Sequence, residues 1–201
     1  MLRIGLTGGL ASGKSFVGQA LADLGCFWIQ ADELGHRAIA PGGASYAGVV
    51  SEFGSGILKD DGTIDRGKLA AEVFDAPDRL EKLNSLVHPP VIRQEEELMQ
   101  EFAAREPSGI AVVEAAILVE TGSQHRFDKL IVAWCTEEQQ IERAMRRPGA
   151  TQEQVIARLK RQMPLGEKVK LADYVINTSA SKEQTIEQVL RVYDSLRRIA
   201  S

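Results

Sequence analysis

A glycine-rich stretch close to the start of the chain decides its fold: Gly8-Gly9-Leu10-Ala11-Ser12-Gly13-Lys14-Ser15. The stretch satisfies the pattern G-x-x-x-x-G-K-[ST] in full. Residues 2–7 before it form a short apolar run, and residues 14–24 after it carry apolar side chains at helical spacing. A strand, a glycine-rich loop and a helix in this order are typical of a loop that wraps its backbone N–H groups around a phosphate.

The loop predicts that the chain binds a nucleoside triphosphate. Lys14 would reach the β- and γ-phosphates, and the Ser15 hydroxyl would ligate Mg²⁺. The alternative is a chance match in a glycine-rich turn. The chain has 18 glycines in 201 residues, and such a match would then arise in roughly one chain in a hundred before the flanking strand and helix are required.

The composition fits a globular enzyme. With 201 residues, 44% of them hydrophobic, the chain can bury a core as one domain or as one domain with a large insertion. The net charge of −4 argues against a dedicated nucleic-acid binder. We find neither an 18-residue apolar segment nor a basic and apolar leader, so we expect a cytoplasmic protein without a membrane partner. Cys26 and Cys135 lack metal-ligand spacing, and we expect two buried structural thiols.

The pattern along the chain predicts a three-layer α/β fold with one helical insertion. Continuous apolar runs suit parallel strands covered on both faces, and we expect them at residues 2–7, 26–30, 110–114, 129–135 and 174–176. Helical spacing occupies residues 14–24, 137–147, 152–161 and 183–198. Between residues 32 and 107 we expect only helices, at residues 66–74, 78–87 and 91–105, separated by turns at residues 41–43, 60–62 and 88–90.

Asp32 is the second candidate for chemistry, because it comes directly after the predicted strand at residues 26–30. In an open α/β sheet, ligands bind beyond the carboxyl ends of the strands, which is also where the phosphate loop lies. A carboxylate there could accept the proton of an attacking hydroxyl or hold water on Mg²⁺. The alternative is that Asp32 caps a helix beginning at Glu33, and the two roles can coexist.

A basic cluster on two consecutive predicted helices is the third candidate. Arg143 and Arg147 are four residues apart, so on a helix they would share one face and could clamp phosphates. Pro148 and Gly149 separate the helices, which suits the joint of a flap that excludes water. The alternative is a solvated charged face, which is the fate of most such runs.

These features define a phosphoryl-transfer enzyme without naming its acceptor. The order of further motifs resembles the dephospho-CoA kinase family over nearly the whole chain. Besides the loop and Ala31-Asp32, the resemblance rests on Asp61-Gly62-Thr63-Ile64-Asp65-Arg66, His88-Pro89, Leu118-Val119-Glu120, Gln140-Ile141-Glu142-Arg143 and Ala172-Asp173-Tyr174-Val175-Ile176. The first two of these elements, Asp61–Arg66 and His88-Pro89, discriminate far better than the phosphate loop.

The resemblance implies transfer of the γ-phosphate of ATP to the ribose 3′-hydroxyl of dephospho-CoA, the final step of coenzyme A synthesis. It implies a nucleotide-binding core at residues 1–31, 108–136 and 166–201, a helical CoA-binding insertion at 32–107 and a lid at 137–165. ATP and Mg²⁺ would be required. No nucleic-acid partner is implied.

Carried over by position, the resemblance also assigns roles to single residues. Catalysis would fall to Asp32, as base or positioning carboxylate, and to Lys14, Arg143 and Arg147. Asp32, Arg66 and His88 would receive the acceptor. ATP would be bound by Gly9, Leu10, Ala11, Ser12, Gly13, Lys14, Ser15, Phe16 and Arg143, with Ser15 on the metal.

Several positions depart from the family pattern, among them Ala116, which replaces the proline expected ahead of Leu118-Val119-Glu120. Ala11 stands where glycine is usual, and Phe16 stands where threonine is usual, but the loop mechanism uses neither side chain. Pro148 replaces a common acid after the lid arginine. Residues 177–181 lack the acidic residue and glycine that are usual in the turn before the last helix, so we leave that turn out of the site.

Two other functions compete with this interpretation. A related P-loop nucleoside or nucleotide kinase would share the loop, Asp32 and the arginine lid, but not the elements at residues 61–66 and 88–89. A GTP-dependent switch would need an Asn-Lys-x-Asp guanine reader, and the sequence contains no such tetrapeptide.

Overall fold

The computed structural model describes residues 1–74 and 76–200, and the chain divides into two compact units. The first unit comprises Met1–Gln30 and Glu101–Ser201, and the second comprises Ala31–Gln100. The division into core, insertion and lid expected from the sequence stays a prediction. Its ranges include residues 75 and 201, which lie outside the described residues.

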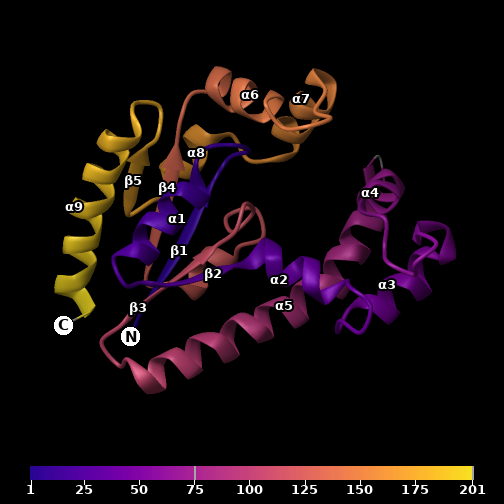
Figure 1. Ribbon diagram of the computed structural model, residues 1–201, viewed down its shortest axis with the longest axis horizontal. Helices are drawn as coiled ribbons and strands as arrows, with labels where there is room; N and C mark the ends of the chain where they lie inside the picture. Colours follow the sequence, from indigo (N-terminus) through magenta and orange to yellow (C-terminus); the bar gives the residue numbers. More distant parts are fainter. Residues whose placement is uncertain (75, 201) are drawn as a thin grey trace. The chain divides into compact units, whose positions relative to one another are not determined.

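The first unit is built on a parallel sheet, as expected (Figure 1). In the described chain the strands are β1 (Leu2–Gly8), β2 (Phe27–Gln30), β3 (Ile110–Glu114), β4 (Lys129–Trp134) and β5 (Tyr174–Asn177). They lie side by side in the order β2-β3-β1-β4-β5. Since β1 is central, its carboxyl end opens the phosphate-binding loop in the middle of the sheet edge where ligands bind in this fold class.

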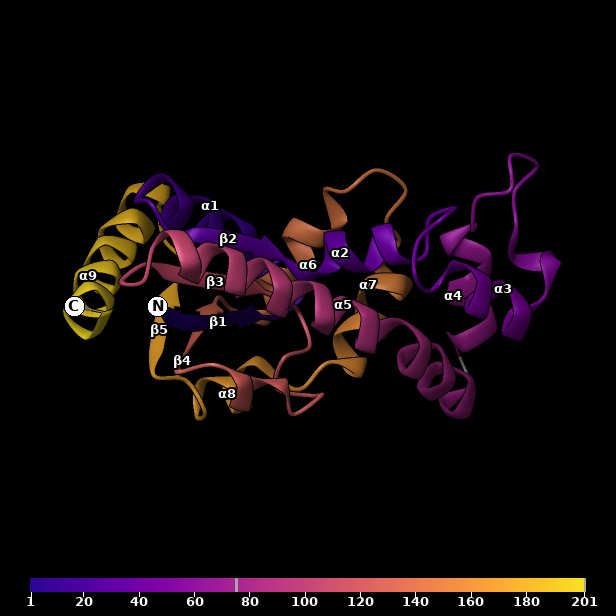
Figure 2. The ribbon, with the colours of Figure 1, turned by 90° about the horizontal axis from the view of Figure 1, so that it is seen from below.

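Helices cover both faces of the sheet (Figure 2). On one face α1 (Lys14–Asp23) and α9 (Lys182–Ala200) contact each other and bury alternate side chains of the strands. On the other face α8 (Leu165–Val169) packs against β4. In the central strands β1, β3 and β4, most residues on either face are buried, which explains why these strands read as continuous apolar runs.

The predicted lid consists of α6 (Glu137–Met145) and α7 (Gln152–Arg161), which contact each other. A threonine begins each helix: Thr136 forms a capping box with Gln139, and the Thr151 hydroxyl accepts a hydrogen bond from the N–H of Gln154. These caps fix where each helix starts, so the turn between them lies at residues 146–151.

The second unit is helical and has its own apolar core. It contains α2 (Ala31–Ala38), α3 (Tyr46–Phe53), the short 3₁₀ helix η1 (Ser55–Ile57), α4 (Arg66–Phe74) and most of α5 (Pro77–Arg105). Its core is formed by Val49, Phe53, Ile57, Ile64, Leu69 and Val73. The absence of strands expected here holds for the described residues apart from one bridge between Leu58 and Ile64.

One prediction for this region was wrong, because no turn interrupts the helix at residues 88–90. Helix α5 is continuous over 29 residues, with Pro89 and Pro90 inside it. An interior proline removes a helix hydrogen bond and costs about 3 kcal/mol. Packing on both sides offsets this cost: Leu83 and Leu86 lie against the core of the second unit, and Val91 and Met99 are buried further along.

Helices α3 and α8 were not predicted from the sequence. Among the described residues, no helix is both long and apolar enough to cross a bilayer.

Candidate active site

The phosphate-binding loop leaves the amino end of α1 open. Gly13 occupies the N-cap position of α1 in a left-handed conformation with φ of +87°. Because glycine has no side chain, this N-cap residue supplies no capping hydrogen bond. Gly8 permits the close approach of β1 to β4 where the loop begins, since a Cβ there would lie 2.6 Å from the Ala133 carbonyl oxygen. The first turn of α1 therefore presents the positive end of its dipole, as an anion site requires.

Ser15, the expected metal ligand, is held by an acidic side chain that the sequence analysis did not select. Its hydroxyl donates a 2.7 Å hydrogen bond to Oε1 of Glu114, and the indole Nε1 of Trp28 donates to Oε2 at 3.1 Å. Glu114 is the last residue of β3 and is buried. A buried carboxylate is thus oriented beside the hydroxyl, and the hard oxygen atoms of both suit Mg²⁺.

Two glutamines of the predicted lid hold the loop at Leu10. Gln140 in α6 donates from Nε2 to the Leu10 carbonyl oxygen at 2.8 Å, and Gln162, which follows α7, accepts from the Leu10 N–H at 2.8 Å. Within the loop, Lys14 donates from Nζ to the Gly9 carbonyl oxygen at 2.9 Å. The loop backbone is therefore tied to the lid at one residue.

Arg143 is oriented by the turn that the sequence analysis left out of the site. Its guanidinium donates to the Thr178 carbonyl oxygen at 2.6 Å and to Thr178 Oγ1 at 3.2 Å. The Thr178 hydroxyl in turn donates to the Ser12 carbonyl oxygen of the loop at 2.7 Å. Arg143 is thereby fixed relative to the phosphate-binding loop.

Arg147 lies outside the helix that carries Arg143. The expectation that the two share one helical face was wrong, because α6 ends at Met145 and Arg147 is exposed in the following turn. The prediction extended the helix to residue 147 on helical periodicity, whereas Pro148 disfavours helical conformation in the residue before it.

A cavity of about 590 Å³ lies beside the loop, between the lid helices and the end of β4. Gly9, Trp134, Gln140, Ile156, Leu159 and Met163 are among the residues that line it. The lid therefore meets the loop through the side chains of Gln140 and Gln162, with open space beside those contacts.

Asp32 lies in the first turn of α2 and is exposed. The alternative that Asp32 caps a helix beginning at Glu33 was wrong: α2 begins at Ala31, directly after β2 ends at Gln30. Asp32 is thus inside the helix, where its charge favours the amino-terminal dipole but where it is not the cap.

Arg66 and His36 are paired in the second unit. Nη1 of Arg66 lies 2.7 Å from Nε2 of His36, and Glu33 is 3.8 Å from the other ring nitrogen, Nδ1. A guanidinium can only donate, so Nε2 must accept and the imidazole carries its proton on Nδ1. His88, the other acceptor candidate, is half-buried in α5, and burial lowers its pKa. Burial therefore favours the neutral form of this imidazole.

Two carboxylates of the motif at residues 61–66, those of Asp61 and Asp65, accept hydrogen bonds from residues two or three positions along the chain. Hydrogen bonds from the Thr63 hydroxyl and N–H lower the pKa of Asp61. The backbone N–H groups of Lys68 and Gly67 do the same for the pKa of Asp65, which caps α4. The motif thus shapes a turn and a helix start that present Arg66.

Comparison with known proteins decides the family. The family model described as dephospho-CoA kinase matches residues 2–184. This chain belongs to the dephospho-CoA kinase family. The dephospho-CoA kinase of Aquifex aeolicus is 42% identical over 198 residues, which cover 98% of this chain and 99% of that one. The resemblance read from the motifs is confirmed.

Solved structures agree with the assignment to the dephospho-CoA kinase family. The structure of TT1252 from Thermus thermophilus matches with a TM-score of 0.80 at 31% identity, and covers 96% of both chains. A dephospho-CoA kinase from Campylobacter jejuni matches with a TM-score of 0.62 at 25% identity, again over 96% of both. As a member of this kinase family, the chain uses ATP as co-substrate and dephospho-CoA as acceptor.

In this dephospho-CoA kinase family member, the sequence analysis missed Glu114, Gln162 and Thr178. Glu114 carries the same signal as Asp32, an acid at the end of an apolar strand, and could have been found by the same argument. Gln162 and Thr178 carry no local signal, because their roles depend on contacts with residues more than a hundred positions away.

Proposed function

We propose that the chain transfers the γ-phosphoryl group of ATP to the ribose 3′-hydroxyl of dephospho-CoA, giving coenzyme A and ADP. The bond between the 3′-oxygen and phosphorus forms, the bond to the β-phosphate oxygen breaks, and the hydroxyl proton leaves to a base. The observation that carries the proposal is the pairing of Ser15 with buried Glu114 at the open amino end of α1, in a chain of this family.

The loop binds the triphosphate. Its backbone N–H groups surround the β-phosphate at the amino end of α1, and Lys14 exchanges the Gly9 carbonyl oxygen for phosphate oxygens. Gly9, Leu10, Ala11, Ser12 and Gly13 contribute backbone, and Phe16 follows in the first turn. Arg143, oriented by Thr178, and Arg147, on the exposed turn of the lid, neutralise the charge that develops on the transferred group.

Mg²⁺ fits the residues present. Ser15 and Glu114 would hold it together with phosphate oxygens, directly or through water, which is the usual pattern for this ion. It would supply charge neutralisation between the phosphates. Among the described residues, no group of three or more acidic, histidine or cysteine side chains offers an all-protein metal cage, which agrees with a metal that arrives with the nucleotide.

Asp32 is the proposed base or positioning carboxylate for the 3′-hydroxyl. Gln30, at the end of β2, is in register with Glu114 at the end of β3, and Asp32 follows Gln30 by two residues. Chain connectivity therefore supports a role at the carboxyl edge of the sheet. Arg66 and His88 are proposed to bind the acceptor, Arg66 as a cation for phosphate and His88 as a neutral hydrogen-bonding partner.

One assay tests the proposal. Purified protein with Mg²⁺ and ATP should release ADP when dephospho-CoA is added, and the product should carry a 3′-phosphate detected by ³¹P NMR and mass spectrometry. Asp32→Asn should lower kcat by at least about 10²-fold and leave ATP binding intact. Asp23→Asn, the same change at an exposed acid at the far end of α1 from the loop, is the matched control and should stay within about twofold.

Two outcomes would overturn the proposal. Stimulation by a nucleoside or nucleotide in place of dephospho-CoA would identify a related P-loop kinase. A near-normal rate for Asp32→Asn would show that Asp32 takes no part in the chemistry. Its charge would then serve to stabilise the amino-terminal end of α2.

A further inference from the structure

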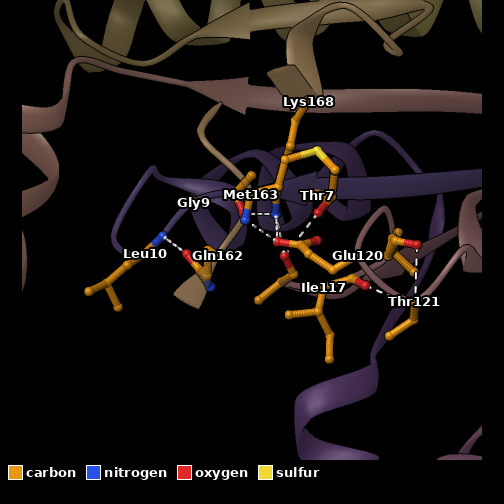
Figure 3. A network of polar contacts seen from close by, with 12 residues as sticks. Thr7, Gly9, Leu10, Ile117, Glu120, Thr121, Gln162, Met163 and Lys168 are labelled. Atoms are coloured by element: carbon orange, nitrogen blue, oxygen red, sulfur yellow. Dashed lines mark hydrogen bonds and ion pairs between the residues drawn. The ribbon is translucent and has the colours of Figure 1, made fainter. Parts of the chain in front are cut away.

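Lys168 is a fully buried lysine that lies behind the phosphate-binding loop. It sits in α8 and has no exposed surface. Figure 3 shows its side chain running inward to Glu120, close to Thr7 and Gly9. Because its ammonium is enclosed by protein groups, it cannot contribute to binding phosphate as Lys14 does.

The ammonium of Lys168 joins three acceptors from two segments. It donates to the Ala116 carbonyl oxygen at 2.7 Å, to Glu120 Oε1 at 2.8 Å and to the Gly8 carbonyl oxygen at 3.3 Å. An ammonium has three donors, so its hydrogen-bonding capacity is fully used. Gly8 is the first residue of the phosphate-binding loop, so one end of the loop is held by this charge.

Glu120 extends the contact to the segment that returns from the lid, residues 162–164. Its Oε1 also accepts a 3.0 Å hydrogen bond from the N–H of Met163. The neighbouring Gln162 accepts from the Leu10 N–H, as Figure 3 shows. The buried pair and the return segment therefore hold the loop at two points, Gly8 and Leu10.

We propose that Lys168 and Glu120 are positioning residues, which hold the phosphate-binding loop and the lid's return segment in the geometry that binds ATP. The expected change in kinetic constants rests on the proposed kinase function. The expected change in ATP affinity does not depend on which acceptor the protein uses. Neither residue touches substrate.

Stability alone does not account for this pair. Replacing a buried ion pair by apolar side chains of similar volume is often neutral or stabilising, whereas an unpaired buried charge is costly. Burial lowers the pKa of Lys168, and the bond to Glu120 only opposes that effect. Oε2 of Glu120 is also buried without a hydrogen-bond partner among the described residues. A pair with these costs is better explained by the geometry it imposes.

The experiment compares Lys168→Met, Glu120→Gln and the double variant Lys168→Met/Glu120→Leu with Lys129→Met. The double variant removes both charges, so it keeps the test possible if a single variant fails to fold. The control breaks another ion pair of the sheet, the 2.8 Å contact between Lys129 and Asp173. This pair is partly exposed and lies where β4 begins, at the opposite edge of the sheet from the loop. Each protein is assayed for melting temperature, KM of both substrates, kcat, and Kd for ATP by calorimetry.

In the folded double variant, KM and Kd for ATP should rise about five- to twenty-fold, while KM for dephospho-CoA stays within about twofold. Lys129→Met should leave all kinetic constants within about twofold. A folded double variant with wild-type affinity for ATP would overturn the inference, as would an equal rise in KM for both substrates. If the wild-type protein binds ATP but does not phosphorylate dephospho-CoA, the proposed function fails, and the shift in Kd still decides the positioning role.

Discussion

Arg143 in the lid and Thr178 after β5 are bound to each other through two hydrogen bonds, of 2.6 Å to the Thr178 carbonyl oxygen and 3.2 Å to its hydroxyl. The same hydroxyl donates to the Ser12 carbonyl oxygen of the phosphate-binding loop. Through its backbone carbonyl and its hydroxyl, Thr178 therefore sets the position of a lid arginine relative to the loop. Loss of that hydroxyl should disturb catalysis more than folding.

Thr178→Val tests this relationship, because valine keeps the shape and removes the hydroxyl. We expect kcat/KM for ATP to fall about tenfold, the equivalent of one hydrogen bond to a charged group. Steady-state kinetics at varied ATP measures the effect. Thr185→Val is the matched control, since Thr185 is also buried and its hydroxyl bonds, within the described chain, to the Ser181 carbonyl oxygen alone. An equal kinetic loss in both variants would contradict a specific role for Thr178.

Glu114→Gln should weaken the response to Mg²⁺. The amide keeps the size of the side chain but removes the negative charge beside Ser15, so we expect the Mg²⁺ concentration for half-maximal rate to rise at least about tenfold. Trp28 contacts Glu114 directly, and in a Trp134→Phe background its fluorescence should change on addition of Mg²⁺ and ATP. An unaltered Mg²⁺ dependence would remove Glu114 from the metal site.

Ala11 is strained, because it is the one non-glycine with positive φ in the described chain, at +53°. Ala11→Gly should therefore not lower the free energy of unfolding and should keep kcat/KM within about twofold. Ala11→Val should destabilise the protein by about 1–2 kcal/mol, since a β-branched side chain tolerates this conformation poorly. Thermal unfolding of the three proteins gives the comparison. A stability order with valine above alanine would contradict the conformation of the loop.

Because the thiol of Cys26 is buried, the free energy of unfolding should fall at alkaline pH. Burial raises the pKa of its thiol to about 12 from an ordinary value of 9.0. Above pH 9 the unfolded chain loses this proton while the native state keeps it, so the stabilisation present below pH 9 is lost as pH rises toward 12. The loss reaches roughly 4 kcal/mol at 1.36 kcal/mol per pH unit. Denaturant unfolding from pH 8 to 10.5 should show a smaller decline in Cys26→Ala than in the wild type. Equal declines would contradict the burial of the thiol.

Local patterns predicted most of the fold. The apolar runs that became β1 to β5 and the helices α1, α6, α7 and α9 are recognisable because their side-chain periods reflect burial in the layers. The prediction of a turn at Pro89 and Pro90 was wrong because packing along α5 outweighs the local preference of proline. The prediction that the helix extends to Arg147 was wrong because the last turn of a helix is set by competition between weak local preferences.

The sequence by itself determined the phosphate-binding loop, the parallel sheet that carries it and the family, because these depend on residue types at fixed spacing. Only the tertiary structure decided which side chains support the loop. Gln140, Gln162, Thr178 and Lys168 reach it from four other segments. Such contacts follow from how distant segments pack, and residue spacing along the chain carries no record of them.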